Sequence, residues 1–201
     1  MTGIDNVSRE TLARLERYAA LLHKWNPTIN LVSRTSLEGL WNRHILDSVQ
    51  LFDLASHPVG HWLDIGSGGG FPGLVIALMR AERGSPERVT MIESDQRKAT
   101  FLRTVLRETE QEGAVLSERI EAASPQRANV ISARAVADLS TLLEYAERHL
   151  APDGVCLFPK GVTWEKEVKA ARKTWSFTLD ERKSQTEPGA VILKIGDLSR
   201  V

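Results

Sequence analysis

The chain has 201 residues, of which 42% are hydrophobic and 26% charged, as in an ordinary globular domain with a full-sized core. Its 26 basic and 26 acidic residues cancel, which argues against a protein that coats nucleic acid by bulk charge but leaves room for a local basic patch. A single cysteine excludes an intrachain disulfide and a cysteine-rich metal site, and with no apolar signal-like start or bilayer-length apolar run we expect a cytoplasmic protein without membrane contact.

Two helical patterns come first in the chain. Apolar residues spaced along one helix face predict a helix over residues 8–25, which Asn26-Pro27 ends. A second helix is expected from about Ser36 to His57-Pro58. We interpret residues 1–58 as an N-terminal helical arm.

From residue 59 onward, short apolar runs alternate with helical patterns. Strands are expected over residues 62–65, 89–93, 114–116, 130–133 and 155–158, and helices over 70–81, 96–109, 138–150 and 162–172. Two further strand-like runs, 175–179 and 190–195, flank a polar loop and predict an antiparallel hairpin. The expected fold for residues 59–201 is one compact α/β unit: a doubly wound, mostly parallel seven-stranded sheet that ends in this hairpin.

The most informative segment is a glycine-rich turn between the first of these strands and the following helix. Read from Gly68, it satisfies the dinucleotide pattern G-x-G-x-x-G; read from Asp64, it is Asp-x-Gly66-x-Gly68-x-Gly70. The second register is favoured because the first glycine should follow the strand directly, as Gly66 does. It resembles the first motif of the class I S-adenosylmethionine-dependent methyltransferases. Asp64 then suits the cofactor's ammonium group, whereas a dinucleotide would place its pyrophosphate at the helix N-terminus.

A second acidic residue, Glu93, ends the next strand. A carboxylate there can accept hydrogen bonds from both ribose hydroxyls of an adenosine. Both cofactor interpretations predict this acid, so it supports an adenosine nucleoside without choosing between them.

Further motifs stand in order around the glycine turn. They are Trp25-Asn26-Pro27-Thr28-Ile29-Asn30-Leu31, Arg43-His44-Ile45-Leu46-Asp47-Ser48, Ser132-Ala133-Arg134-Ala135 and Pro159-Lys160-Gly161. Together they closely resemble the bacterial 16S rRNA guanine-N7 methyltransferases of the RsmG (GidB) family, over about residues 22–195. The resemblance implies a Rossmann-like class I methyltransferase fold.

The resemblance also implies roles for individual residues. The cofactor's methionine side is expected at Gly66 and Phe71, the ribose at Glu93, Ser94 and Asp95, and the adenine at Ile120 and Glu121. Arg134 is expected to line the active site and contact the cofactor, and Lys160 to help position the substrate. Asn129 and Ala133 stand where the family usually has aspartate and serine.

Candidate RNA contacts also have structural alternatives. Arg43 can hold a phosphate in a bidentate fork and His44 can stack on a base, but an Arg43–Asp47 pair that props up the helix is the alternative. Asn30 is a candidate RNA contact that turn chemistry alone also explains. Lys160 can neutralise a phosphate, with a weakly supportive basic surface at Lys166, Lys169, Arg172 and Lys173. Trp164, Trp175 and Cys156 are expected in the core.

The chemistry expected from the resemblance is methyl transfer from S-adenosylmethionine to N7 of a guanine, position 527 in the 530 loop of 16S rRNA. Guanine N7 carries a lone pair and no proton, so alignment can suffice without a general base or metal. We expect a monomer that acts on 16S rRNA or the small ribosomal subunit. Three alternatives stay open. The first is a methyltransferase that acts on another RNA site, on a small molecule or on a protein. The second is a nicotinamide-dependent oxidoreductase, and the third is a non-catalytic ribosome-assembly protein.

Overall fold

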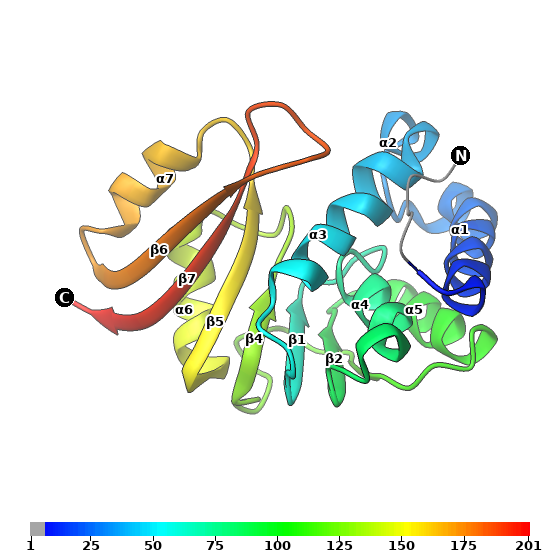
Figure 1. Cartoon of the computed structure of the whole chain (residues 1–201), viewed down its shortest axis with the longest axis horizontal. Helices are drawn as coiled ribbons and strands as arrows, with labels where there is room; N and C mark the ends of the chain where they lie inside the picture. Colours follow the sequence, from blue (N-terminus) through cyan, green and yellow to red (C-terminus); the bar gives the residue numbers. More distant parts are fainter. Residues whose placement is uncertain (1–6) are drawn as a thin grey trace.

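The computed structural model describes residues 7–201 (Figure 1). The helical elements are α1 (Arg9–Ile29), α2 (Arg34–Glu38), the π-helix η1 (Trp41–Leu46), α3 (Asp47–Leu54), α4 (Gly73–Arg83), α5 (Gln96–Glu108), α6 (Leu139–His149) and α7 (Trp164–Ala171). The strands are β1 (His61–Ile65), β2 (Arg88–Ile92), β3 (Ala114–Leu116), β4 (Ala128–Ser132), β5 (Leu150–Lys160), β6 (Trp175–Lys183) and β7 (Val191–Arg200). No helix within this described part has the length and apolar character needed to cross a bilayer.

The strands form one seven-stranded sheet in the order β3-β2-β1-β4-β5-β7-β6. The first five strands are parallel, and β7 runs antiparallel to both β5 and β6. The order reverses between β1 and β4, which is where a doubly wound sheet opens a crevice at the carboxyl ends of its strands. The expected fold and C-terminal hairpin are therefore confirmed.

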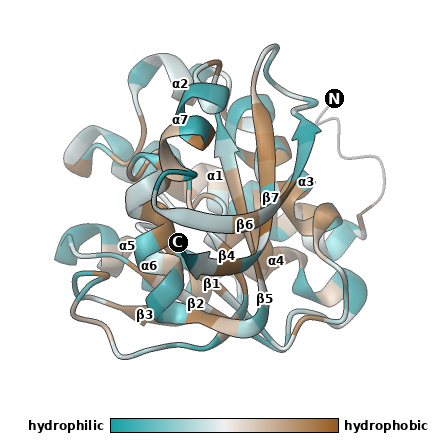
Figure 2. Cartoon of the chain, turned by 90° about the vertical axis from the view of Figure 1, so that its left-hand side faces the viewer, coloured by the Kyte–Doolittle hydropathy of each residue, from teal (hydrophilic) through white to brown (hydrophobic). Residues whose placement is uncertain are grey.

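Helices cover both faces of the sheet. Figure 1 shows α1, α4 and α5 on one side and α6 and α7 on the other. Alternate strand residues supply the two cores: Trp62 belongs to the cluster under α1, α4 and α5, while Leu63 and Ile65 belong to the cluster under α6 and α7. Figure 2 shows β5 and β7 largely brown, whereas β6 at the sheet edge grades to teal at its polar end. Trp175 and Cys156 are buried, as expected, and Trp164 packs against the second core.

The first helix is longer than its sequence pattern predicts, so the expected stop at Asn26-Pro27 is wrong. Helix α1 continues through Pro27 to Ile29 and is capped by Asn30, whose φ of 50° is left-handed. A proline removes one helical hydrogen bond, but here the carbonyl it leaves free belongs to the exposed residue His23. Packing of Trp25 and Ile29 against the core holds the last turn in place.

The second expected helix is interrupted once, at Gly39, and its second part begins with a π-helical turn that continues directly into α3. Gly39 ends the short α2, the wider π-helical turn η1 follows, and α3 ends at Leu54, before the expected His57-Pro58 stop. The sequence pattern does not reveal this because a π-helical turn differs from an α-helical turn by one residue of register. The π-turn carries Arg43 and His44, and such turns are frequent at functional sites.

The remaining boundaries differ from expectation by a few residues, and by more at the start of β5 and in the C-terminal hairpin. β5 begins at Leu150 and β6 continues to Lys183, because cross-strand hydrogen bonds extend strands through polar residues that hydropathy does not mark. Helix α1 packs on α4 and α5, and residues of the arm and sheet share one hydrophobic cluster. The division between residues 58 and 59 stays a prediction.

Candidate active site

The glycine loop (residues 66–70) follows β1 directly. Gly66, Gly68 and Gly70 adopt positive φ values of 65°, 54° and 99°, which side chains disfavour. These are the alternate glycines of the register that starts at Asp64. Gly73, the last glycine of the competing register, instead packs on Asp64, because an added Cβ there would lie 2.7 Å from the Oδ2 atom.

Asp64 lies beneath the glycine loop and is fully buried. Its carboxylate accepts hydrogen bonds from Ser132 Oγ at 2.8 Å and from the Gly73 amide at 3.2 Å. Ser132 Oγ in turn accepts from Trp62 Nε1 at 2.9 Å. Burial raises the pKa of Asp64 to about 6. Asp64 thus joins β1, β4 and α4 below the loop; it is not among the residues that line the cavity above.

Glu93 lies immediately after β2 and holds the glycine loop from the side. Its Oε2 atom accepts from the Gly68 amide at 2.8 Å and its Oε1 atom from the Asp95 amide at 2.7 Å. The side chain is buried but lines the cavity. The predicted strand-end carboxylate is therefore placed beside the loop, where it can face a bound nucleoside.

Tyr18 supports the glycine loop from within the core, and the sequence patterns did not single it out. Its hydroxyl donates to the carbonyl of Gly69 at 2.6 Å, and its ring lies 5.2 Å from that of Phe71. Burial raises the pKa of Tyr18 well above its ordinary value, so the hydroxyl stays protonated. Tyr18 lies three residues after Leu15 and four before Leu22, both on the predicted apolar face, so helical spacing could have placed it.

The glycine loop forms part of the floor of a cavity of about 880 Å³. This volume suits a small-molecule cofactor together with part of a second ligand. The cavity is also lined by residues from every neighbouring part of the fold: Leu31, Val32, Ser33, Thr35, Ser36, Arg43, His44, Asp47, Phe71, Glu93, Lys98, Arg134, Ala135, Val136, Ala137, Pro159, Lys160, Gly161, Glu167, Ser184, Glu187, Ala190, Val191 and Ile192.

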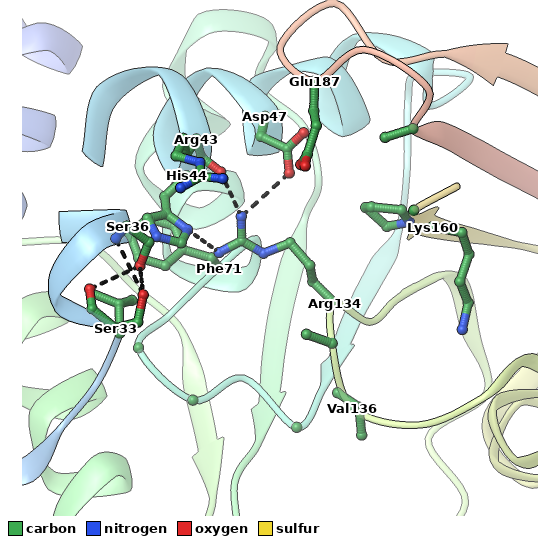
Figure 3. Close-up of a pocket in the computed structure, with 18 of the residues that line it drawn as sticks. Ser33, Ser36, Arg43, His44, Asp47, Phe71, Arg134, Val136, Lys160 and Glu187 are labelled. Atoms are coloured by element: carbon green, nitrogen blue, oxygen red, sulfur yellow. Dashed lines mark hydrogen bonds and ion pairs between the residues drawn. The ribbon is translucent and has the colours of Figure 1, made fainter. Parts of the chain in front are cut away.

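Arg134 joins the sheet to the helical arm. We call the residues that meet around it the Arg134 cluster: Arg43, His44, Asp47, Phe71 and Arg134. Its Nη1 atom donates to the Arg43 carbonyl at 3.0 Å and to Asp47 Oδ2 at 3.3 Å. Its Nη2 atom lies 2.6 Å from His44 Nδ1, and the guanidinium lies 5.1 Å from the centre of the Phe71 ring. Figure 3 shows the guanidinium between His44 and Asp47.

The cluster rules out one of the two interpretations of the arm motif, and the RNA contacts of Arg43 and His44 stay predictions. Asp47 pairs with Arg134, so the alternative of an Arg43–Asp47 prop is wrong. Arg43 keeps an exposed side chain at the cavity. His44 stacks on Phe71, with ring centres 4.8 Å apart and planes inclined by 24°. Burial, and then the charges of Arg134 and Arg43, lower the pKa of His44 to about 4, so the imidazole is neutral near pH 7.

Lys160 lines the cavity but its ammonium is already engaged. Its Nζ atom donates to Glu167 Oε2 at 2.8 Å and to the Ala137 carbonyl at 2.9 Å, and its side chain is only 9% exposed. Figure 3 shows the ammonium directed away from the Arg134 guanidinium. Glu167 also accepts from the Leu139 amide, so this ion pair braces the segment that follows Arg134.

Several predicted contacts lie outside the cavity lining. Ser94 and Asp95 adjoin Glu93, and Asp95 caps α5 through the amides of Arg97 and Lys98. The Ile120 carbonyl accepts from His149 Nε2, and the Glu121 carboxylate from the Tyr145 hydroxyl. Their cofactor contacts stay predictions.

Asn30 and Asn129 both make local contacts, and the RNA contact of Asn30 stays a prediction. Asn30 is the exposed, left-handed cap of α1, and its amide donates to the Asn26 carbonyl. Asn129 accepts from the His61 amide at the amino end of β1, away from the cavity. Across residues 7–201 no three side chains of metal-binding type are grouped.

Comparison with known proteins matches residues 11–190 to the family model described as rRNA small subunit methyltransferase G. The ribosomal RNA small subunit methyltransferase G of Ruegeria sp. (strain TM1040) is 56% identical over 196 residues, covering 98% of this chain and 95% of that protein. The corresponding protein of Ruegeria pomeroyi is 54% identical over 197 residues, covering 98% and 96%.

A solved structure extends the comparison to the fold. The ribosomal protein L11 methylase from Lactobacillus delbrueckii subsp. bulgaricus superimposes with a TM-score of 0.58 at 18% identity, covering 77% of this chain and 76% of that one. At this identity the likeness concerns the fold alone. The family model matches most of the chain, and both relatives are more than half identical over nearly their full length. The chain therefore belongs to the rRNA small subunit methyltransferase G (GidB) family.

Proposed function

We propose that this chain transfers a methyl group from S-adenosylmethionine to N7 of the guanine at position 527, in the 530 loop of 16S rRNA. Family membership makes the chain an S-adenosylmethionine-dependent methyltransferase of small-subunit rRNA, in agreement with the sequence-based prediction. The choice of base and atom is the part that the site chemistry must support.

The observation that carries the proposal is the continuity of one cavity from the glycine loop to the Arg134 cluster. At the loop end, a Cβ added to Gly68 would find only the Gly66 carbonyl oxygen, 3.8 Å away, so the surface is bare backbone open to a ligand. At the other end, Arg43 and His44 offer charge and a flat ring. A donor at one end and an RNA base at the other would therefore meet inside the cavity.

The residues present fit S-adenosylmethionine. The bare backbone surface of the glycine loop and the wall at Phe71 would receive its methionine side, and Glu93 stands where the ribose hydroxyls of the nucleoside would lie. Bound there, the sulfonium supplies an electrophilic methyl group. The protein's own task is to hold the acceptor atom in line with that methyl and to keep water out, and positioning of this kind can lower a barrier by roughly 7–11 kcal/mol.

Three titratable groups at the cavity are already engaged, which suits an acceptor that needs no deprotonation. The Nδ1 lone pair of His44 is occupied by Arg134, Asp47 is paired with the same guanidinium, and Glu167 is paired with Lys160. None of these three is free to act as a general base. Guanine N7 fits this arrangement, because its in-plane lone pair carries no proton.

The proposed enzyme acts as a monomer in the cytoplasm on 16S rRNA or the small ribosomal subunit. Arg43 is exposed at the cavity mouth and would meet RNA phosphate. Lys160, already paired, would act by holding the segment around Arg134. The arm, residues 1–58, would close one side of the site on the unit formed by residues 59–201.

Deletion of the gene tests the proposal directly. N7-methylguanine in 16S rRNA is mapped by chemical cleavage in the parent strain, in the deletion strain and in a strain with the gene restored. We expect cleavage in the 530 loop to disappear and return with the gene. Unchanged cleavage at every site would refute the assignment of base and atom.

A further inference from the structure

We infer that the Nε2–H group of His44 donates a hydrogen bond to O6 of the target base and thereby selects guanine over adenine. This inference rests on the proposed function and deepens it by naming the residue that reads the base. It follows from the tautomer that Arg134 imposes on His44.

The tautomer of His44 is determined by its neighbour. A guanidinium has only donors, so the 2.6 Å contact between Arg134 Nη2 and His44 Nδ1 requires a lone pair on Nδ1. A neutral imidazole with a lone pair on Nδ1 carries its hydrogen on Nε2. The Arg134 side chain is itself held by the Arg43 carbonyl and Asp47, so it cannot turn away without breaking those contacts.

The charge environment keeps the ring neutral. Two cations, Arg134 and Arg43, act on His44, and the carboxylate of the cluster, Asp47, is paired with Arg134. Stacking on Phe71 removes one ring face from water. The ring therefore presents one fixed N–H donor and no second one.

That donor has no partner. His44 Nε2 is one of three buried side-chain nitrogen or oxygen atoms in residues 7–201 that make no hydrogen bond, the others being Ser117 Oγ and His149 Nδ1. Only His44 among these three residues lines the cavity. A buried donor without an acceptor costs about 1–3 kcal/mol, and such groups in native proteins call for an explanation. An acceptor delivered by the substrate would satisfy it.

The chemistry of purines identifies that acceptor. Guanine presents N7 and O6 as adjacent acceptors on one edge, whereas adenine presents N7 beside the N6 amino donor. With N7 directed at the methyl group, O6 is the neighbouring atom available to a donor on the cavity wall. Adenine in the same place would bring two donors together and leave Nε2–H unpaired.

A test uses small subunits in which the target guanine of 16S rRNA is replaced by 2-aminopurine, which keeps N7 and the 2-amino group but lacks O6. Inosine, which keeps O6 but lacks the 2-amino group, is the matched control base. Wild type and the His44→Phe variant are compared on all three bases by kcat/KM. Phenylalanine keeps a flat ring for stacking on Phe71 and removes the donor.

For the wild type we expect 2-aminopurine to lower kcat/KM by about 10- to 100-fold relative to guanine. For His44→Phe, guanine and 2-aminopurine should be methylated at similar reduced rates, while inosine should carry the same penalty in both proteins. His44→Gln, which can still donate, should retain a 2-aminopurine penalty. His23→Phe, on the exposed face of α1, should behave as the wild type.

A 2-aminopurine penalty that persists undiminished in His44→Phe would overturn the inference. So would a loss of S-adenosylmethionine affinity in His44→Phe as large as its loss of kcat/KM, because the donor would then serve the cofactor. If His44→Phe is unfolded by its melting curve, a guanine-to-2-aminopurine ratio near one in His44→Gln would equally overturn it. Failure of the wild type to methylate guanine would instead count against the proposed function.

Discussion

The two ends of the cavity are built in opposite ways. The glycine loop is made of consecutive residues, and its shape depends on backbone conformations that only glycine adopts readily. The Arg134 cluster brings together side chains about 90 positions apart in the chain, such as Arg134 and His44, and its shape depends on a guanidinium held at several points. The loop end is formed by the backbone of consecutive residues, and the other end is formed by side chains that are distant in the sequence.

Because the two ends are built differently, substitutions at each end should impair a different step. Damage to the loop should act on cofactor binding, because in the proposed arrangement the cofactor would lie against backbone that a side chain would cover. Damage to the cluster should act mainly on alignment and base choice, because its members hold one another in place. Substitutions at each end should therefore separate binding from alignment.

The largest effect is expected from Gly68→Val. Its φ of 54° strains any side chain, and the added Cβ would project into the open face of the loop. We expect S-adenosylmethionine binding, measured by calorimetry, to be lost. Gly84→Val is the matched control, because Gly84 also has a positive φ of 60° with nothing within 4 Å, but it caps α4 and is absent from the cavity lining. Equal loss of binding in both variants would contradict the prediction.

Arg134→Lys should have the next largest effect. A lysine cannot contact the Arg43 carbonyl, Asp47 and His44 at once, so the cluster loses its geometry while keeping its charge. We expect kcat/KM to fall by about 100-fold, or roughly 2.7 kcal/mol. Arg200→Lys is the control, since Arg200 also pairs with a carboxylate, Glu147, and stacks on an aromatic ring, Trp175, outside the cavity. A similar loss of activity in Arg200→Lys would contradict the prediction that Arg134 acts through its contacts at the cavity.

Asp64→Asn should change how stability depends on pH. The pKa of Asp64 is raised from 3.8 to about 6, so its favourable contribution is complete below about pH 4 and is lost as pH rises through 6. His44 and His61 act oppositely: their pKa values are lowered from 6.5 to about 4, so their contribution is present above pH 6.5 and lost as pH falls.

Removing Asp64 should therefore leave the histidine effect unopposed. The free energy of unfolding of the cofactor-free protein is measured in urea. As pH rises from 4 to 7, this free energy should increase in Asp64→Asn relative to the wild type by on the order of 2 kcal/mol. A difference between the two proteins that does not vary with pH would show that Asp64 is not the group responsible.

The smallest effect is expected from Lys160→Gln. Because its ammonium is paired with Glu167, it should contribute no phosphate contact, and the slope of log affinity for RNA against log salt should not change. Loss of a phosphate contact would instead reduce the slope by about 0.7–0.9. Arg43→Gln provides the comparison, because the exposed Arg43 is expected to give that reduction. If Lys160→Gln reduced the salt slope as much as Arg43→Gln does, Lys160 would contact phosphate and the prediction would be wrong.

Several features were readable from the sequence because they are local. Strand and helix alternation, the Asp64 register of the glycine turn and the placement of Glu93 all depend on spacing within about thirty residues, and the structure agrees with each. Motif resemblance added the family, which the comparisons confirm. The errors lie where packing overrides local preference, as at Pro27 inside α1 and in the π-turn at Arg43 and His44.

What only the tertiary structure decided is how distant polar groups pair. Asp47 was four residues from Arg43, the obvious helical partner, yet its carboxylate pairs with Arg134 from across the fold. Lys160 stood in a ligand-binding region, yet Glu167 neutralises it. Local sequence determines which residues can form a helix, strand or turn; charge pairing and the tautomer of His44 depend on neighbours that meet only when the sheet and arm have packed, because hydrogen bonds act over about 3 Å in space and not along the chain.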